Sequence, residues 1–571
     1  MDILEKTISA APGSRRWVRE VAVTALLLSA SVLLFFYRLD SLSLFDADEP
    51  AYAEAAREML VSGDWITPHF NFRPRFDKPI LFYWLIALAY KWFGVGEYAA
   101  RFWSAAFATG LTLSIYRFGR QRLGQRAAAI AALAFAANVG TVVLARAAVT
   151  DMTLTFCMTW ALFCFFDVFA AADRTRERFV FVGYVAMALA VLTKGPIGLL
   201  LPGFIIGLFL IIREKARAAL SRLRVLPGMG LFAVIALPWY GLVLYENGWA
   251  FIQGFFVQHH LHRYLGVISG HVGGVLYFLP VIVLGFFPWS GTLPDAVRQL
   301  WTIRSRLRAE LTERQELLLF LWLWCGVVVL FFSFSRTKLP SYIFPAVPAL
   351  ALLVGMAGEV GINERRQAEG WARVCDRLIA GIACSLAMIL LLLPVIADRI
   401  RLREAPDIPP FAFGFAPRVL AVLLLVGLAF TIRARRRQNG DAAVAGMAVT
   451  MVVSLVMAAH WIAPAIQESL QTSLRDFALY ARRELRPIDL LVAYDLNAPS
   501  LVFYSERPVA IIRKGEEAEL RRLTTDHGRL FIVARTAAES RLRMIPDIFP
   551  LDRRGGYVLY SNRYGPNGRS G

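Results

Sequence analysis

The amino-acid sequence predicts a polytopic α-helical membrane protein with about thirteen transmembrane helices and a small C-terminal α/β domain. Hydrophobic residues make up 57% of the 571 positions and charged residues 18%, and the mean hydropathy is +0.52. Soluble domains do not have this balance. Nearly uncharged runs such as 21–37, 382–397 and 442–457 approach the ~20 residues that cross about 30 Å of hydrocarbon. Such runs recur along most of the chain, and basic residues gather between them.

The N-terminal end is predicted to be an uncleaved first span. Arg15, Arg16 and Arg19 precede a long apolar segment, as they would in a signal peptide. The small residues of a cleavage site do not follow, because the segment runs into Arg38 and Asp40. The five cysteines lie in or beside predicted spans without a CxxC pair, so we expect neither a disulfide framework nor a zinc knuckle.

Basic loops predict the topology, because Lys and Arg in short loops stay on the cytoplasmic side. These loops lie at 117–126, 174–178, 213–224, 298–314, 365–377 and 433–437. They share one side with the N-terminus only if the short, aromatic segment 79–93 lies on the membrane surface instead of crossing it. The net charge of +19 then reflects topology and attraction to anionic lipid, not nucleic-acid binding.

This topology divides the chain into a transmembrane domain, 1–465, and an outer α/β domain, 466–571. The first outer loop, 38–98, carries interfacial helices. The turn at Asp151 and the stretches 247–274 and 335–342 are expected on the same side. In the outer domain we expect helices at 467–485 and 516–523 and strands at 490–494, 501–504, 509–512, 530–534 and 557–560.

Three carboxylates, those of Asp46, Asp48 and Glu49, stand where the first outer loop begins a helix-forming run. One interpretation is helix capping, with Asp46 at the N-cap, Glu49 three residues on and Pro50 in the first turn. Capping accounts for one or two acids but not for all three. A carboxylate at this interface could also act as a base or hold a cation.

Four other charged residues follow later in the chain. Asp77 and Lys78 precede an apolar helix, where the Lys suits a phosphate but could also extend to lipid headgroups. Asp151 lies at the outer end of a span, where it could be a functional acid or an N-cap. Lys194, beside Gly195 and Pro196, is interpreted as capping a tight turn between two helices.

A histidine cluster and a basic turn complete the set of candidates. His259, His260 and His262 have a metal-like spacing, but no nearby acid or Cys completes a zinc site. Contact of His260 and Arg263 with an anion or substrate is the favoured interpretation. The turn 336–345 contains Lys338 and Tyr342, which could anchor the chain at the interface or clamp a lipid phosphate.

Several motifs occur in order between about residues 39 and 560. They are Asp48-Glu49 with Tyr52-Ala53-Glu54, Ala56-Arg57-Glu58-Met59, Ser62-Gly63-Asp64-Trp65, Phe76-Asp77-Lys78-Pro79 with Tyr83-Trp84, Leu192-Thr193-Lys194-Gly195-Pro196, Pro238-Trp239-Tyr240, His260 with Arg263, Pro288-Trp289, Lys338-Leu339-Pro340 with Tyr342 and Pro345, and Ser500-Leu501-Val502-Phe503-Tyr504. In these motifs the chain resembles the bacterial aminoarabinose (4-amino-4-deoxy-L-arabinose) lipid A transferases. Those enzymes are relatives of the protein O-mannosyltransferases and have the GT-C membrane fold.

The resemblance implies roles for particular residues. Asp48 would be the principal catalytic carboxylate, with Asp151 as its partner, and Lys78 and Tyr342 would hold the phosphate of the donor. Asp77 would orient Lys78. The resemblance also places Glu49, His260, Arg263 and Lys338 among the substrate-binding residues. A divalent cation is the one cofactor considered, with Asp48 and Asp77 as candidate ligands, and no organic cofactor is expected.

The implied activity is an inverting transfer of a sugar from a polyprenyl-phosphate (undecaprenyl-phosphate) donor to a periplasmic acceptor, with lipid A favoured. The expected location is the bacterial inner membrane, with a cytoplasmic N-terminus, a periplasmic site and a monomeric chain. Two departures leave the sugar open: Ala51 replaces the usual Arg of the first motif, and Asp77 with Ile80 replaces a Glu and a second Pro.

Two alternatives remain. The chain could transfer another sugar, such as a hexose, mannose or uronic acid, to a core oligosaccharide, another envelope lipid or a protein. From a different class, it could be a lipid or sugar transporter. The scarcity of ionisable residues within the spans and the absence of paired broken helices disfavour transport.

Overall fold

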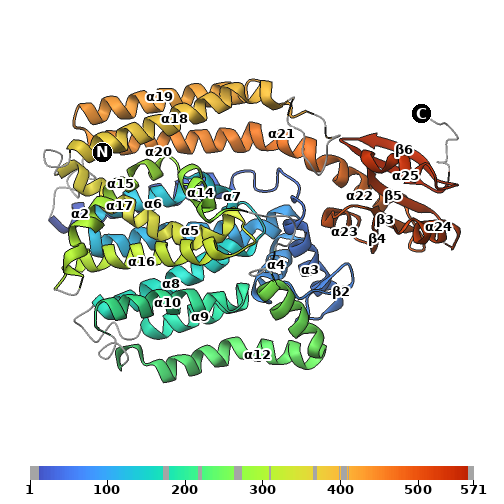
Figure 1. Ribbon diagram of the computed structural model, residues 1–571, viewed down its shortest axis with the longest axis horizontal. Coiled ribbons are helices and arrows are strands. Elements are labelled where there is room, and N and C mark those ends of the chain that lie inside the picture. Colours follow the sequence, from blue (N-terminus) through green and yellow to red (C-terminus); the bar gives the residue numbers. More distant parts are fainter. Residues whose placement is uncertain are drawn as a thin grey trace, which may run out of the picture.

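The computed structural model describes residues 12–170, 179–215, 221–262, 266, 273–307, 310–363, 369–397, 399, 408, 410–526 and 528–563. These residues form a large helical bundle with a small mixed domain at one end, and the helices α3 and α4 lie at that same end (Figure 1). A helical path from α20 through α21 to α22 leads from the bundle into the sheet of the small domain.

The helices of the first half of the chain are α2 (Pro12–Ser31), α3 (Asp48–Ser62), α4 (Leu81–Phe93), α5 (Glu97–Leu123), α6 (Gln125–Ala136), α7 (Val139–Ala145), α8 (Thr150–Ala170), α9 (Phe179–Lys194), α10 (Ile197–Ile212) and α12 (Val225–Phe251), which continues as the π-helix η3 (Ile252–His262). The helices of the second half are α14 (Phe278–Gly285), α15 (Leu293–Ile303), α16 (Glu313–Phe334), the 3₁₀ helix η7 (Pro340–Ala346), α17 (Val347–Asn363), α18 (Glu369–Ala397), α19 (Ala416–Arg436), α20 (Gly440–Met457), α21 (Ala463–Gln467), η9 (Glu468–Thr472) and α22 (Ser473–Glu484).

Small side chains allow the bundle helices to approach closely. A Cβ added at Gly355 of α17 would lie 2.4 Å from the carbonyl oxygen of Ala127 in α6. A Cβ added at Gly228 of α12 would lie 2.0 Å from the ring of Tyr184 in α9. Helices in lipid associate through such close packing, because lipid gives them little hydrophobic driving force.

In the described part of the chain, eight helices are long and apolar enough to cross a membrane, and two bent pairs bring the number to ten. The bent pairs are Gln125–Ala136 with Val139–Ala145 and Val275–Gly285 with Trp289–Ile303. Helix α4 has 13 residues and is therefore about 20 Å long, too short to cross alone. The count of thirteen stays a prediction, since α5, α9 and α10 would also have to cross.

The small domain contains a five-stranded sheet with the strand order β4-β3-β5-β7-β6. Its strands are β3 (Leu490–Tyr494), β4 (Val509–Ile512), β5 (Leu530–Arg535), β6 (Phe549–Arg554) and β7 (Tyr557–Ser561), and its helices are α23 (Pro499–Ser505), α24 (Glu517–Asp526) and α25 (Glu539–Leu542). Strand β3 pairs in parallel with β4 and β5, whereas β7 pairs antiparallel with β5 and β6.

Two details of the predicted domain are wrong. The run 501–504 is part of helix α23, because a short apolar run does not distinguish a buried strand from a buried helix. Strand β6 was missed because it is an edge strand that contains Pro550 and three charged residues and lacks a regular apolar alternation. The proposed boundary at 465/466 lies inside the continuous helical stretch Gly440–Glu484.

The small domain packs on the outer segment of the first loop. Residues of α3 and α4 share one apolar core with α22, α23 and strands β3 and β5. Strands β1 (His69–Phe70) and β2 (Arg73–Pro74) form a two-residue hairpin beside α3. This core fixes the segment that begins with Asp48 against the end of the bundle.

Candidate active site

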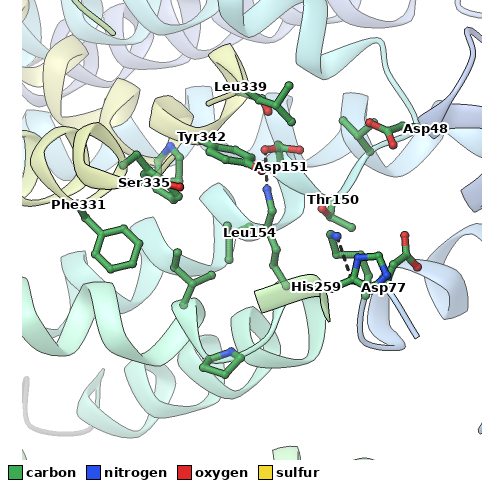
Figure 2. Close-up of a pocket in the computed structure, with 18 of the residues that line it drawn as sticks. Asp48, Asp77, Thr150, Asp151, Leu154, His259, Phe331, Ser335, Leu339 and Tyr342 are labelled. Atoms are coloured by element: carbon green, nitrogen blue, oxygen red, sulfur yellow. Dashed lines mark hydrogen bonds and ion pairs between the residues drawn. The ribbon is translucent and has the colours of Figure 1, made fainter. Parts of the chain in front are cut away.

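A cavity of about 470 Å³ opens at the end of the bundle where α3 and α4 lie. It forms there because α8, α10 and η7 begin and α9 and α16 end around it. Its lining residues are Asp48, Tyr52, Asp77, Lys78, Val149, Thr150, Asp151, Leu154, Lys194, Pro196, Ile197, Leu200, Phe256, His259, Phe331, Phe332, Ser335, Leu339, Ser341, Tyr342 and Pro345. In Figure 2, Asp48, Asp77 and His259 lie on one side of this space and Phe331 lies on the opposite side.

Five of the predicted site residues therefore meet in one cavity. Asp48, Asp77, Lys78, Asp151 and Tyr342 all line it, although as many as 294 positions separate the first from the last. The segments that carry them were predicted to lie on one side of the membrane, and the structure brings these segments together at one end of the bundle.

One wall of the cavity is built from a charged loop. The guanidinium of Arg75 donates to both carboxylate oxygens of Asp77, at 2.7 and 2.6 Å, and Tyr83 Oη donates to Asp77 at 3.2 Å. Lys78 Nζ donates to the carbonyl oxygen of Asp77 at 2.9 Å. Asp77 thus braces the loop that presents Lys78, and its orienting role in the reaction stays a prediction.

The electrostatics of this wall keep Asp77 ionised. Burial opposes its charge, but Arg75 and Lys78 outweigh burial and hold the pKa of Asp77 well below its ordinary value. Arg75 also lies 5.5 Å from the ring centre of Tyr52, which lines the cavity. Asp77 and Lys78 of this loop line the cavity, whereas Arg75 supports Asp77 and is not among the described lining residues.

A second ion pair stands across the cavity. Lys194 Nζ donates to Asp151 Oδ1 at 2.8 Å, and the same ammonium lies 5.6 Å from the centre of the Tyr342 ring. Asp151 is in the first turn of α8 and Lys194 is the last residue of α9. Lys194 was interpreted as a turn cap from sequence. Its position in the cavity, paired with Asp151, makes it a site residue that sequence reasoning missed.

The beginning of α3 differs from the predicted capping arrangement. The N-cap residue is Ala47, which makes no side-chain cap hydrogen bond, and Asp48 is the first helical residue. Asp46 is not the N-cap; its carboxylate instead accepts hydrogen bonds from Gln471 and Ser500. Of the three acids in this cluster, only Asp48 lines the cavity.

Glu49 lies outside the cavity, which corrects the prediction that it contacts substrate. Its carboxylate accepts from Arg101 Nε at 2.9 Å and Nη2 at 2.8 Å, from the backbone N–H of Phe45 at 2.8 Å and from that of Ala148 at 2.7 Å. Burial disfavours the charge of Glu49, but Arg101 and these backbone donors lower its pKa below the ordinary value. Because Ala148 lies three residues before Asp151, Glu49 fixes the two predicted catalytic acids relative to one another.

We expect Glu49→Ala to destabilise the protein by about 3–5 kcal/mol, because it leaves the buried Arg101 without its counter-charge. Thermal unfolding in detergent would measure the change. The matched control is Arg482→Ala, which breaks the half-exposed Arg482–Glu506 pair and should cost less than about 1 kcal/mol. Equal destabilisation by the two variants would contradict the structural role of Glu49.

The remaining predicted residues fall into two groups. Lys338 is 5% exposed, donates to the carbonyl oxygen of Ser335 and is not among the described residues that line the cavity, so its predicted substrate contact is not supported. Arg263 and the side chain of His260 lie outside the described residues. The neighbouring His259 does line the cavity, and the histidine cluster was the signal that could have identified it.

The other side of the cavity is apolar. Leu154, Ile197, Leu200, Phe331 and Phe332 contribute to it from α8, α10 and α16. Such a surface cannot solvate a charge, but it can hold a hydrocarbon chain whose polar end reaches the charged wall that contains Lys78. The cavity is therefore amphipathic.

The described residues contain no group of three or more His, Cys, Asp or Glu side chains that could hold a metal ion. Of the two predicted ligands, Asp77 directs both oxygens at Arg75. The divalent cation stays a prediction.

Comparison with known proteins agrees with this geometry. The family model of dolichyl-phosphate-mannose-protein mannosyltransferases matches residues 77–241. An uncharacterized protein of Aquifex aeolicus is 32% identical over 325 residues, which cover 57% of this chain and 70% of that protein. The undecaprenyl phosphate-α-4-amino-4-deoxy-L-arabinose arabinosyl transferase of Pseudomonas aeruginosa (strain UCBPP-PA14) is 32% identical over 343 residues, 58% of this chain and 59% of that enzyme.

Solved structures extend the likeness to the whole chain. The crystal structure of ArnT from Cupriavidus metallidurans bound to undecaprenyl phosphate is 27% identical, with a TM-score of 0.80, and the match covers 98% of this chain and 100% of that one. The archaeal oligosaccharyltransferase AglB from Archaeoglobus fulgidus, at 13% identity and a TM-score of 0.52, shares the fold. These matches confirm both the predicted GT-C fold and the resemblance that the motifs indicated. The chain belongs to the aminoarabinose transferase family of GT-C membrane glycosyltransferases, relatives of the protein mannosyltransferases.

Proposed function

We propose that this protein transfers a sugar, of the aminoarabinose type, from undecaprenyl phosphate to lipid A at the outer face of the bacterial inner membrane. One observation carries the proposal: a single cavity combines three carboxylates, two ammonium groups and an apolar side. A polyprenyl-phosphate sugar has the complementary parts, namely a long hydrocarbon chain, an anionic phosphate and a sugar to be attacked.

The donor is proposed to lie between the apolar side and the charged wall of the cavity. Its hydrocarbon chain would contact Phe331, Phe332 and Leu200, and its phosphate would lie between Lys78 and Tyr342. An ammonium group is a compact cation that binds phosphate well, and a phenol can donate a further hydrogen bond. Binding of undecaprenyl phosphate by the structurally similar ArnT supports this placement.

The proposed reaction is one displacement at the anomeric carbon. The acceptor hydroxyl gives its proton to the Asp48 carboxylate as its oxygen bonds to that carbon. The bond between the anomeric carbon and the phosphate oxygen breaks, and its electron pair remains on undecaprenyl phosphate. Lys78 stabilises the developing charge on the leaving phosphate. A single displacement inverts the anomeric configuration.

The ion pair of Asp151 and Lys194 is proposed to support this step from the other side of the cavity. Asp151 holds the ammonium of Lys194 at 2.8 Å, which places a second cation within the same 470 Å³ space. Asp151 then acts as the partner of Asp48 by orienting this cation, while Asp48 accepts the proton of the acceptor hydroxyl.

Two observations bear on the sugar and the acceptor. The alignment with the Pseudomonas aeruginosa transferase covers 59% of that enzyme, and Ala51, where the family motif carries an Arg, is 2% exposed in α3. This departure from the family motif is compatible with a different donor sugar. Transfer of another sugar to a core oligosaccharide, another envelope lipid or a protein is therefore the second candidate.

The proposed orientation places the cavity and the small domain in the periplasm and the N-terminus in the cytoplasm. The basic segment 117–126 supports it, because its Arg122 pairs with Asp167, near the end of α8 opposite Asp151.

Mass spectrometry of lipid A and envelope glycans from the host, with and without the gene, tests the proposal. We expect lipid A to lose a mass equal to one aminopentose unit when the gene is deleted. An unchanged lipid A with a mass loss in another glycan would support the second candidate. Transport would be supported instead by two results together. The covalent composition of every glycan would be unchanged, and an undecaprenyl-phosphate sugar would accumulate on one face of the membrane.

A further inference from the structure

The segment 43–46, which leads into the helix that begins with Asp48, has irregular backbone. Backbone N–H groups in such a segment need partners from elsewhere when they are buried. Three of its four N–H groups donate to side chains that follow more than 400 positions later: Ser43 to Gln467 Oε1 at 3.1 Å, Leu44 to Tyr504 Oη at 2.8 Å and Asp46 to Gln471 Oε1 at 3.3 Å.

The carboxylate of Asp46 is held by the same part of the chain. It accepts from the backbone N–H of Ser500 at 2.8 Å and from Gln471 Nε2 at 2.8 Å, and it also accepts from Ser500 Oγ. The side chains of Ser500 and Gln471 are buried, at 0% and 2% exposure. Since these donors converge on a single carboxylate, the contact is specific and does not depend on general apolar packing.

The start of α3 has little local support of its own. Its N-cap residue, Ala47, forms no side-chain hydrogen bond, and Asp48 follows directly. We infer that the small C-terminal domain positions the catalytic carboxylate: Gln471 and Ser500 hold Asp46, and through it they set where Asp48 stands in the cavity. The inference rests on the proposed function, in which Asp48 is the base.

Attachment of the domain does not depend on Asp46 alone. Asn71 forms two hydrogen bonds with Val509 of the edge strand β4, from Nδ2 to the carbonyl oxygen at 2.8 Å and from the backbone N–H to Oδ1 at 2.9 Å. A shared apolar core joins the domain to α3 and α4. Positioning of Asp48 can therefore be separated experimentally from docking of the domain.

The test compares Asp46→Ala with Asn71→Gly in the full-length enzyme, reconstituted with an undecaprenyl-phosphate sugar and its acceptor. Gly suits position 71 because the backbone φ there is +56°. For Asp46→Ala we expect kcat to fall about tenfold to a hundredfold. The KM for the donor should change by less than about twofold, because a misplaced base impairs the transition state and not donor binding. Asp46→Asn, which retains an acceptor oxygen, should recover part of kcat, and Asn71→Gly should resemble the wild type. An unchanged kcat in Asp46→Ala, or an equal loss in Asn71→Gly, would overturn the inference.

Hydrogen–deuterium exchange provides a readout that does not depend on catalysis. In Asp46→Ala, amides of the peptide 46–53 should exchange faster than in the wild type, whereas strand β5 should keep its protection. Unaltered exchange in that peptide would overturn the inference even if activity falls. If the wild-type enzyme transfers no sugar, the proposed function fails, and the exchange result still decides whether the domain fixes the segment that carries Asp48.

Discussion

Replacement of Asp48 by Asn is expected to lower kcat for sugar transfer by about a thousandfold, because general-base catalysis of this kind contributes about 10²–10⁴-fold. The amide has nearly the same shape as the carboxylate but cannot accept the acceptor proton. Asp48 lines the cavity as the first residue of α3, whereas Asp46 and Glu49 are engaged by partners outside the cavity. Asp48 is therefore the acid of this cluster that substrate can reach.

The measurement is transfer of radiolabelled or mass-tagged sugar by purified enzyme in proteoliposomes. Asp40→Asn is the matched control, because Asp40 is exposed in the same loop and does not line the cavity. Full activity in Asp48→Asn would remove the base from the proposed reaction. If Asp151→Asn lost all transferase activity and Asp48→Asn retained it, the roles of the two acids would be exchanged.

Replacement of Lys78 by Ala is expected to lower kcat/KM for the donor by about 10²–10³-fold, the usual cost of removing one group that stabilises a developing anion. Lys78 is presented to the cavity by a loop that the Arg75–Asp77 pair stiffens. Its ammonium would neutralise the phosphate both in the bound donor and, more strongly, in the departing undecaprenyl phosphate. Both kcat and donor affinity should therefore fall.

Lys91→Ala is the matched control for this variant. Lys91 belongs to the neighbouring helix α4, and its ammonium lies 4.8 Å from the ring centre of Trp65, away from the cavity lining. Lys78→Arg should retain part of the activity, since it keeps the charge but changes its geometry. Donor turnover by Lys78→Ala equal to that of Lys91→Ala would show that Lys78 does not contact the phosphate.

The local pattern of residues was sufficient for several features of the site. Asp48, Asp77, Lys78, Asp151 and Tyr342 were identified from charged residues at the ends of apolar runs and from the family motifs. Such residues are recognisable in the sequence because a charge near the membrane costs free energy unless it has a polar partner or a function. The same logic could not separate Asp48 from Glu49, since adjacent acids have the same local signature.

The local pattern did not reveal which acid pairs with which basic residue. Glu49 is neutralised by Arg101, 52 positions away, and Lys194 pairs with Asp151 across 43 positions. From sequence, Lys194 resembled a helix-end cap and Glu49 a substrate ligand. Only the packing of α3, α5, α8 and α9 against each other selects these pairs.

The sequence by itself determined that this chain is a multi-pass membrane protein of the GT-C class, with a small mixed domain near its end and with its candidate site residues on one set of loops. Hydrophobic length, charge placement and motifs are local quantities, so they can be read from the chain without its fold. The tertiary structure decided which acid faces the cavity, that 501–504 is helical, and that Asp46 is held by Ser500 from 454 positions away. These features depend on which surfaces meet when the bundle and the small domain pack, and contacts over such separations leave no periodic signal in the sequence.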